Sequence, residues 1–103
     1  MLTIMIHATI KEEYLDEYIE LASFLTRETR NKTEGCISYA FNQRQDKPTE
    51  FVIFEQWENQ EALDEHIRHL VTLLGPPRDG DSLPEKLITM YDSGIPYYYT
   101  VIE

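Results

Sequence analysis

The chain has 103 residues, with 19 acidic and 9 basic side chains that give a formal net charge of −10 at pH 7. A chain of this length buries only about 60–70% of the surface that its unfolded form exposes. We therefore expect a single domain over residues 1–103 that either packs well or shares its core with another chain. The negative charge and the scattered basic residues exclude a phosphate-tracking surface, so we expect no nucleic-acid partner.

The single cysteine, Cys36, cannot form an intramolecular disulfide, which favours a reducing compartment. The first ten residues are largely apolar but carry no basic leader. Charged residues at 11–13 end this run well short of the ~20 residues that a bilayer span needs. We therefore expect a soluble, cytoplasmic protein without a membrane partner.

The first half of the chain predicts a strand, a helix and a second strand. Residues 2–10 alternate with period two and are rich in β-branched side chains, which is typical of a strand. Residues 12–32 carry apolar side chains at helical spacing, with acidic residues early and basic residues late, as the helix dipole favours. After Gly35, residues 36–41 alternate again and predict a strand.

The second half predicts a strand, a helix, a loop and a further strand. Both faces of the strand at 51–57 carry large apolar side chains. Asn59 is a candidate N-cap for a helix over about 60–74, which Gly75 and two prolines end. A loop follows to about residue 86, and 87–91 is expected to be the fourth strand. The tail at 97–102 also has high strand propensity, and it either extends the sheet edge or crosses to a second subunit.

This order, β-α-β-β-α-β, predicts an α+β, ferredoxin-like fold in which two helices cover one face of an antiparallel sheet. The third strand would then leave aromatic surface in water unless a second sheet covers it. We therefore expect a homodimer in which two sheets face each other.

Two side chains on the third strand and the second helix are candidate catalytic residues. His66 falls at the border of the helix's apolar stripe, where an imidazole can exchange a proton while its surroundings exclude water. The alternative is a structural histidine bonded to a backbone carbonyl. Glu55 is the one carboxylate in an apolar row, where it orients an imidazole or an indole, or else forms an inter-strand or subunit ion pair.

Trp57 offers a flat ring face and an N–H donor to an aromatic ligand, with plain core packing as the alternative. Tyr39 and His7 are candidate pocket-wall residues by strand parity. The pair of His66 and His69 has no third ligand at a recognised spacing, so no metal site is expected.

Residues 34–39 (EGCISY), 51–57 (FVIFEQW) and 61–63 (EAL), followed by His66, resemble the antibiotic biosynthesis monooxygenase (ABM) domain in the correct order. The resemblance implies a dimeric α/β barrel with a pocket between sheet and helices in each subunit. It also implies cofactor-independent oxygenation of a small phenolic or quinol-type aromatic to a quinone by dioxygen.

On this hypothesis, His66 is the base or hydrogen-bond partner of the substrate, and Glu55 orients it. Trp57, Tyr39 and Phe54 form the pocket walls.

A related branch with this fold degrades haem, and residues 87–94 are similar to its last strand. That branch uses an asparagine, a tryptophan and a ligating histidine. Here His7 and His66 stand at the first two positions, and the third falls near Gly75, so haem degradation is not expected. The remaining alternative is a non-catalytic dimer that binds a small ligand or regulates another process.

Overall fold

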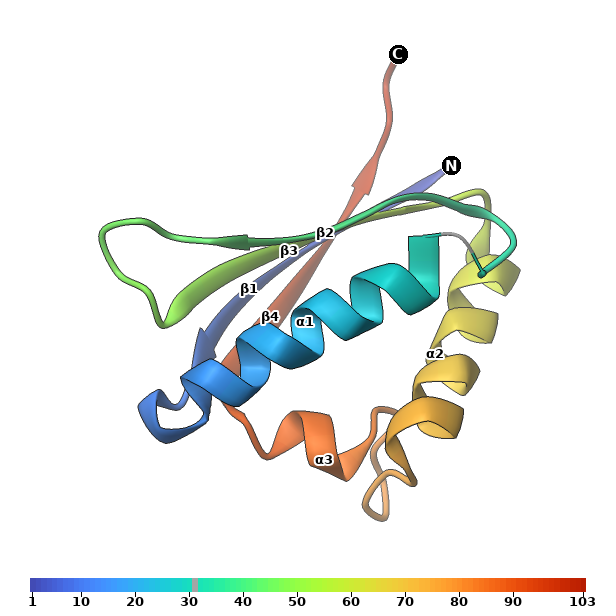
Figure 1. Ribbon diagram of the computed structural model, residues 1–103. Helices are drawn as coiled ribbons and strands as arrows, with labels where there is room; N and C mark the ends of the chain where they lie inside the picture. Colours follow the sequence, from blue (N-terminus) through green and yellow to red (C-terminus); the bar gives the residue numbers. More distant parts are fainter. Residues whose placement is uncertain (31) are drawn as a thin grey trace.

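The computed structural model describes residues 1–30 and 32–103. Four antiparallel strands form one sheet in the order β2-β3-β1-β4. These strands are β1 (Leu2–Ile10), β2 (Cys36–Gln43), β3 (Glu50–Trp57) and β4 (Tyr91–Thr100). The helices are η1 (Glu12–Tyr14), α1 (Leu15–Arg30), α2 (Gln60–Leu74) and α3 (Glu85–Ile88). Helices α1, α2 and α3 all lie on one side of the sheet (Figure 1), which confirms the predicted ferredoxin-like architecture.

Strand β1 lies in the middle of the sheet and pairs with β3 on one side and β4 on the other. Successive side chains of β1 point to opposite faces of the sheet. Ile4, Ala8 and Ile10 are buried under the helices, whereas Met5 and His7 point to the opposite face. Ile4 lies opposite Glu55 of β3, so the two residues share the helix-covered face.

The two long helices begin and end where the sequence predicts, within a few residues. Helix α2 is capped by Asn59, whose side chain accepts a hydrogen bond from the Ala62 N–H at 2.9 Å. It ends at Gly75, whose φ of +102° is a conformation that glycine adopts readily. Helix α1 starts later than expected, because residues 12–14 form a 3-10 turn first.

The fourth strand differs from the prediction. Leu87 and Ile88 belong to α3, which buries Leu87 in the core, and the strand begins only at Tyr91. The tyrosine-rich tail is the main part of β4, since Tyr97 lies opposite Met5 and Thr100 opposite Leu2. On the side away from β3, the backbone N–H and C=O groups of β1 pair with β4, a segment distant in sequence. Local sequence patterns do not predict such a long-range pairing.

The sheet face away from the helices, called the open face below, has no covering element in the described part of the chain (Figure 1). Most side chains on it are half-buried or exposed, with Ile95 at 51% and Tyr97 at 47% exposure, and Thr3 is buried. By strand register, the open face consists of Thr3, Met5, His7, Thr9, Ser38, Ala40, Asn42, Glu50, Val52, Phe54, Gln56, Ser93, Ile95, Tyr97 and Tyr99.

The described part of the chain contains no helix that is both long and apolar enough to cross a membrane. The core lies entirely on the helix-covered face, in two adjoining clusters. One surrounds Trp57 and Tyr39, and the other surrounds Tyr18 and Phe51.

Candidate functional site

A cavity of about 530 Å³ lies between the helix-covered face of the sheet and the helices. Its walls come from all four strands, from α1 and α2, and from the segment around α3. Most of the lining is aliphatic or aromatic, and a few polar groups, among them Glu55 and His66, interrupt it. The volume and the mostly apolar lining with few polar groups are typical of small-molecule sites.

Glu55 is the buried acidic residue of this cavity, with 6% of its surface exposed. Strand alternation places it on the same face as Trp57, two residues on, and the indole Nε1 donates a hydrogen bond to Glu55 Oε1 at 3.0 Å. Burial raises the pKa of Glu55 to about 7, although the Trp57 hydrogen bond acts in the opposite direction. The carboxyl group can therefore hold or release a proton near neutral pH.

His66 reaches the cavity from α2 and is 3% exposed. Its ring centroid lies 4.6 Å from that of Trp57, at an interplanar angle of 32°, and 5.1 Å from the Tyr39 ring. Burial, together with the nearby His69, lowers the pKa of His66 to about 4, so the imidazole is neutral at physiological pH. Its buried Nδ1 has no hydrogen-bond partner among the described residues.

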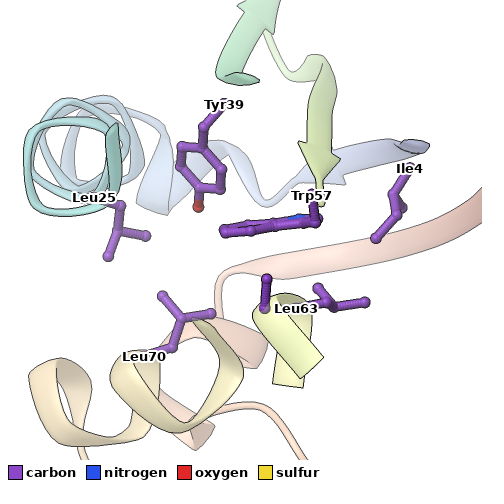
Figure 2. Close-up of a cluster of buried hydrophobic side chains, with 7 residues drawn as sticks. Ile4, Leu25, Tyr39, Trp57, Leu63 and Leu70 are labelled. Carbon is purple, nitrogen blue, oxygen red and sulfur yellow. The ribbon is translucent and has the colours of Figure 1, made fainter. Parts of the chain in front are cut away.

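Tyr39 completes this aromatic group from β2. Figure 2 shows its ring next to the Trp57 indole, with Leu63 and Leu70 of α2 facing both. The Arg30 Nε of α1 donates a hydrogen bond to the Tyr39 carbonyl at 2.8 Å, which ties β2 to the helix. Burial, and then the Glu55 charge, raise the pKa of Tyr39 well above its usual value, so its hydroxyl stays protonated.

Three of the expected site residues, His66, Glu55 and Tyr39, line the same cavity. Trp57 is fully buried behind them and holds Glu55 and His66 in place. Among the described residues, the Glu55 side chain bonds the Trp57 indole and not His66. Of the two alternatives, Glu55 therefore orients the indole, and no hydrogen bond in the described structure supports its proposed role as orienter of the histidine.

Two expected pocket residues, Phe54 and His7, lie elsewhere. Both are on the open face, where the His7 ring packs edge-on against Tyr97 at 5.5 Å. Successive residues of a strand point to opposite faces, so a cavity that contains Glu55 excludes its neighbour Phe54. For the same reason, the isoleucines of β1 occupy the cavity side and His7 does not.

Tyr91, which no sequence pattern singles out, lines the cavity from the start of β4. Its hydroxyl lies 2.5 Å from that of Tyr18 on α1. Burial raises the pKa of Tyr91 to about 12, so this hydroxyl is also protonated at neutral pH. The prediction of a strand over 87–91 concealed this residue, because it put Tyr91 at the end of an element instead of under the helices.

Comparison with known proteins gives a family and a fold. The family model of the antibiotic biosynthesis monooxygenase (ABM) domain matches residues 1–69. The uncharacterized protein sll1783 of Synechocystis is 34% identical over 59 residues, which is 57% of this chain and 40% of that protein. The chain thus matches about two fifths of the length of this curated relative.

Solved structures share the fold over nearly the whole chain. A conserved protein from Methanosarcina mazei is 26% identical, with a TM-score of 0.71, and the match covers 95% of this chain and 89% of that one. A Bacteroides thetaiotaomicron protein reaches a TM-score of 0.81 at 16% identity, with 99% and 90% coverage. A structure described as an antibiotic biosynthesis monooxygenase covers both chains completely, with a TM-score of 0.75 and 21% identity. These structures show the fold, and the match of the family model to residues 1–69 shows that the chain belongs to the antibiotic biosynthesis monooxygenase family.

Proposed function

We propose that the protein is a cofactor-independent monooxygenase that oxidises a small phenolic or quinol-type aromatic with dioxygen inside the cavity. The observation that supports this proposal most is the convergence of Glu55, His66 and Tyr39 on one largely apolar cavity. The family to which the chain belongs is consistent with it.

The reaction balances without an external reductant. One phenol with a free para position and one dioxygen give one quinone and one water, so the ring supplies all four electrons. The deprotonated ring transfers an electron to dioxygen, and a carbon–oxygen bond forms at the para carbon. The proton taken from the hydroxyl then goes to the peroxide. The O–O bond then breaks, so that hydroxide leaves the peroxide while the para hydrogen leaves the carbon as a proton. The oxygen that stays on the carbon becomes the quinone carbonyl, and hydroxide and proton combine as water.

The protein has three tasks in such a reaction: to bind the ring, to hold a proton and to exclude water. The aliphatic and aromatic lining serves the first and the third. Glu55 or His66 serves the second, and Tyr39 offers a hydroxyl that stays protonated at neutral pH.

Incubation of metal-free protein with a panel of phenols and naphthols under ¹⁸O-labelled dioxygen tests the proposal. We expect one labelled oxygen in the quinone for each dioxygen consumed. Spontaneous oxidation of a quinol leaves the quinone unlabelled and produces hydrogen peroxide. Glu55→Gln should abolish labelling, whereas Glu58→Gln, at an exposed position just after β3, should retain it. Unlabelled product throughout the panel would refute the proposal.

A second candidate function is binding of a small aromatic ligand without turnover. The neutral, weakly basic His66 favours it, since an imidazole with a pKa of about 4 is a poor general base at neutral pH. The same panel decides between the two functions. Saturable binding by calorimetry without consumption of dioxygen would support a binding or regulatory role.

We also propose that two copies associate through the open face. By strand register its described side chains include no lysine or arginine and one carboxylate, Glu50 at the start of β3, although the chain has a net charge of −10. That carboxylate accepts a hydrogen bond from the Thr9 hydroxyl and lies 3.5 Å from the Lys47 Nζ, which offsets its charge. Two such faces can therefore meet with little electrostatic repulsion and bury Phe54, Ile95 and Tyr97. Antiparallel sheets that carry apolar groups on both faces are stabilised by a second sheet.

A further inference from the structure

The polar groups that line the cavity in the described part of the chain include carboxyl groups but no basic side chain that is charged at neutral pH. Its lining includes the carboxyl groups of Glu55 and, at an exposed position, Asp92, but no lysine or arginine among the described residues. Its imidazole, His66, is neutral at physiological pH. An anionic ligand would therefore lose its hydration in an apolar cavity without meeting a cation, which is strongly unfavourable.

The titratable groups around Glu55 come from β2, α1, α2 and β4, whereas β1 presents the apolar Ile4 opposite it. They are Cys36 and Tyr39 on β2, Tyr18 on α1, His66 on α2 and Tyr91 on β4. Burial raises the pKa of the thiol and of the three phenols, and lowers the pKa of the imidazole. All five groups are therefore neutral near pH 7, and Glu55, which they surround, is the group whose charge changes there.

Charge balance separates the two candidate proton acceptors. Transfer from a neutral phenol to the Glu55 carboxylate replaces one anion by another, so the cavity keeps a single negative charge throughout. Transfer to neutral His66 would create a cation and an anion where none existed, and the described lining contains no further charge at depth to compensate them. Burial makes the second transfer more costly than the first.

The geometry agrees with this difference. Trp57 Nε1 holds Glu55 Oε1, which fixes the carboxyl group within the cavity wall. His66 packs between the rings of Trp57 and Tyr39, and nothing in the described structure bonds its Nδ1 to stabilise an imidazolium. A neutral imidazole can still donate or accept one hydrogen bond to a ligand.

We propose that the cavity takes up its aromatic ligand uncharged, in preference to anionic analogues, and that the Glu55 carboxylate accepts the hydroxyl proton while His66 remains a neutral hydrogen-bonding group. The proton transfer rests on the proposed monooxygenase function. The charge preference follows from the lining alone and applies equally to a binding protein.

The charge preference is tested with a matched pair of probes, 2-naphthol and 2-naphthoate, which share a ring system and differ in charge. Titration calorimetry at neutral pH should show binding of 2-naphthol that is tighter by roughly tenfold or more. Equal or tighter binding of 2-naphthoate would overturn this half of the proposal. The pair needs no dioxygen and no turnover.

The proton acceptor is tested with a nitrophenol, whose hydroxyl titrates near neutral pH and whose absorbance changes on ionisation. Under argon, the wild-type complex should show a mixture of ionised and neutral probe that stays constant at neutral and mildly alkaline pH, because the two share one proton. His66→Phe, which keeps an aromatic ring beside Trp57, should retain the mixture, as should the control Glu58→Gln. Glu55→Gln should hold the probe neutral.

Infrared difference spectra of the wild-type complex provide a measurement that does not depend on the folding of a variant. Binding of the nitrophenol should produce the carbonyl band of a protonated carboxylic acid. Absence of this band, or loss of ionised probe in His66→Phe but not in Glu55→Gln, would overturn the assignment of Glu55. Both experiments exclude dioxygen, so failure of the labelling experiment alone would refute the monooxygenase function and leave the charge preference standing.

Discussion

The hydroxyl oxygens of Tyr18 and Tyr91 lie 2.5 Å apart, although 73 positions separate the two residues in the sequence. Tyr18 is fully buried and meets Tyr91 edge-on, with ring centroids 5.4 Å apart. Since Tyr91 lines the cavity, the pair joins the first long helix to the start of the last strand at the cavity wall. The stability of this wall therefore depends on a contact between two distant segments.

We expect Tyr91→Phe to destabilise the protein more than Tyr18→Phe. Removal of the Tyr91 hydroxyl leaves the Tyr18 hydroxyl buried without a partner, at a cost of about 1–3 kcal/mol. Removal of the Tyr18 hydroxyl leaves a group that faces the cavity and can bind water, at a cost of about 1 kcal/mol. Urea denaturation of both variants and of the double variant measures the coupling, and strictly additive free energies would contradict a shared hydrogen bond.

The stability gap between Glu55→Gln and wild type should widen with pH. The pKa of Glu55 is raised from about 4.5 to about 7, so the folded state binds the extra proton between these values. The wild type therefore loses stability as pH rises through this window, by up to about 3 kcal/mol, and the glutamine variant does not. His66, with its lowered pKa, contributes in the opposite direction between about pH 4 and 6.5, equally in both proteins.

Urea denaturation of both proteins at a series of pH values measures this gap directly. Contributions from other groups cancel in the difference, because the two chains differ at one buried position. A gap that is independent of pH would mean that Glu55 ionises in the folded state as it does in the unfolded chain.

Gly35→Ala should destabilise the protein far more than Gly80→Ala. The two glycines have nearly the same φ, +85° and +86°, so the backbone cost of alanine, about 1–2 kcal/mol, is shared. A Cβ at position 35 would also lie 2.6 Å from the Cβ of Ala62 on α2, whereas at position 80 it would meet nothing within 4 Å. The additional loss in Gly35→Ala measures the close approach of β2 to α2, and equal thermal unfolding of the two variants would contradict it.

Phe54→Lys should convert the proposed dimer into a monomer at micromolar concentration. Two lysines would face each other across an apolar interface, where unpaired charges are costly. Ile19→Lys, at a partly exposed position on α1 away from the open face, is the matched control and should leave the association state unchanged. Sedimentation velocity measures the state directly. Wild type that sediments as a monomer would refute the association itself.

Much of the fold could be predicted from the sequence because its signals are local. The Asn59 cap, the Gly75 stop and the alternation of β1 each act over a few residues, and all of them match the structure. The position of β4 could not be predicted in this way. It depends on pairing with β1 over a long separation in sequence, and residues 85–88 have enough local preference to form a short helix instead.

The residues of the candidate site likewise differ in whether a local sequence signal marks them. Glu55 and His66 stand out because each breaks an apolar pattern, and the structure brings both to one cavity. Tyr91 carries no such signal, since a tyrosine in a strand is ordinary. The hydrogen-bond partner of Glu55 could not be predicted from the sequence pattern either. Residues two apart on a strand share a face but need not form a hydrogen bond, whereas the Trp57 indole does donate one to Glu55.

Strand β3 directs Glu55 toward the cavity and Phe54 toward the open face, and one peptide unit separates them. A single strand thus separates the cavity, where we propose proton transfer, from the open face, where we propose association. Any substitution or ligand that displaces the β3 backbone by a fraction of its ~3.3 Å repeat must move both sides together. Efforts to broaden the range of ligands by mutating the cavity wall should therefore record the association state of every variant alongside its affinity.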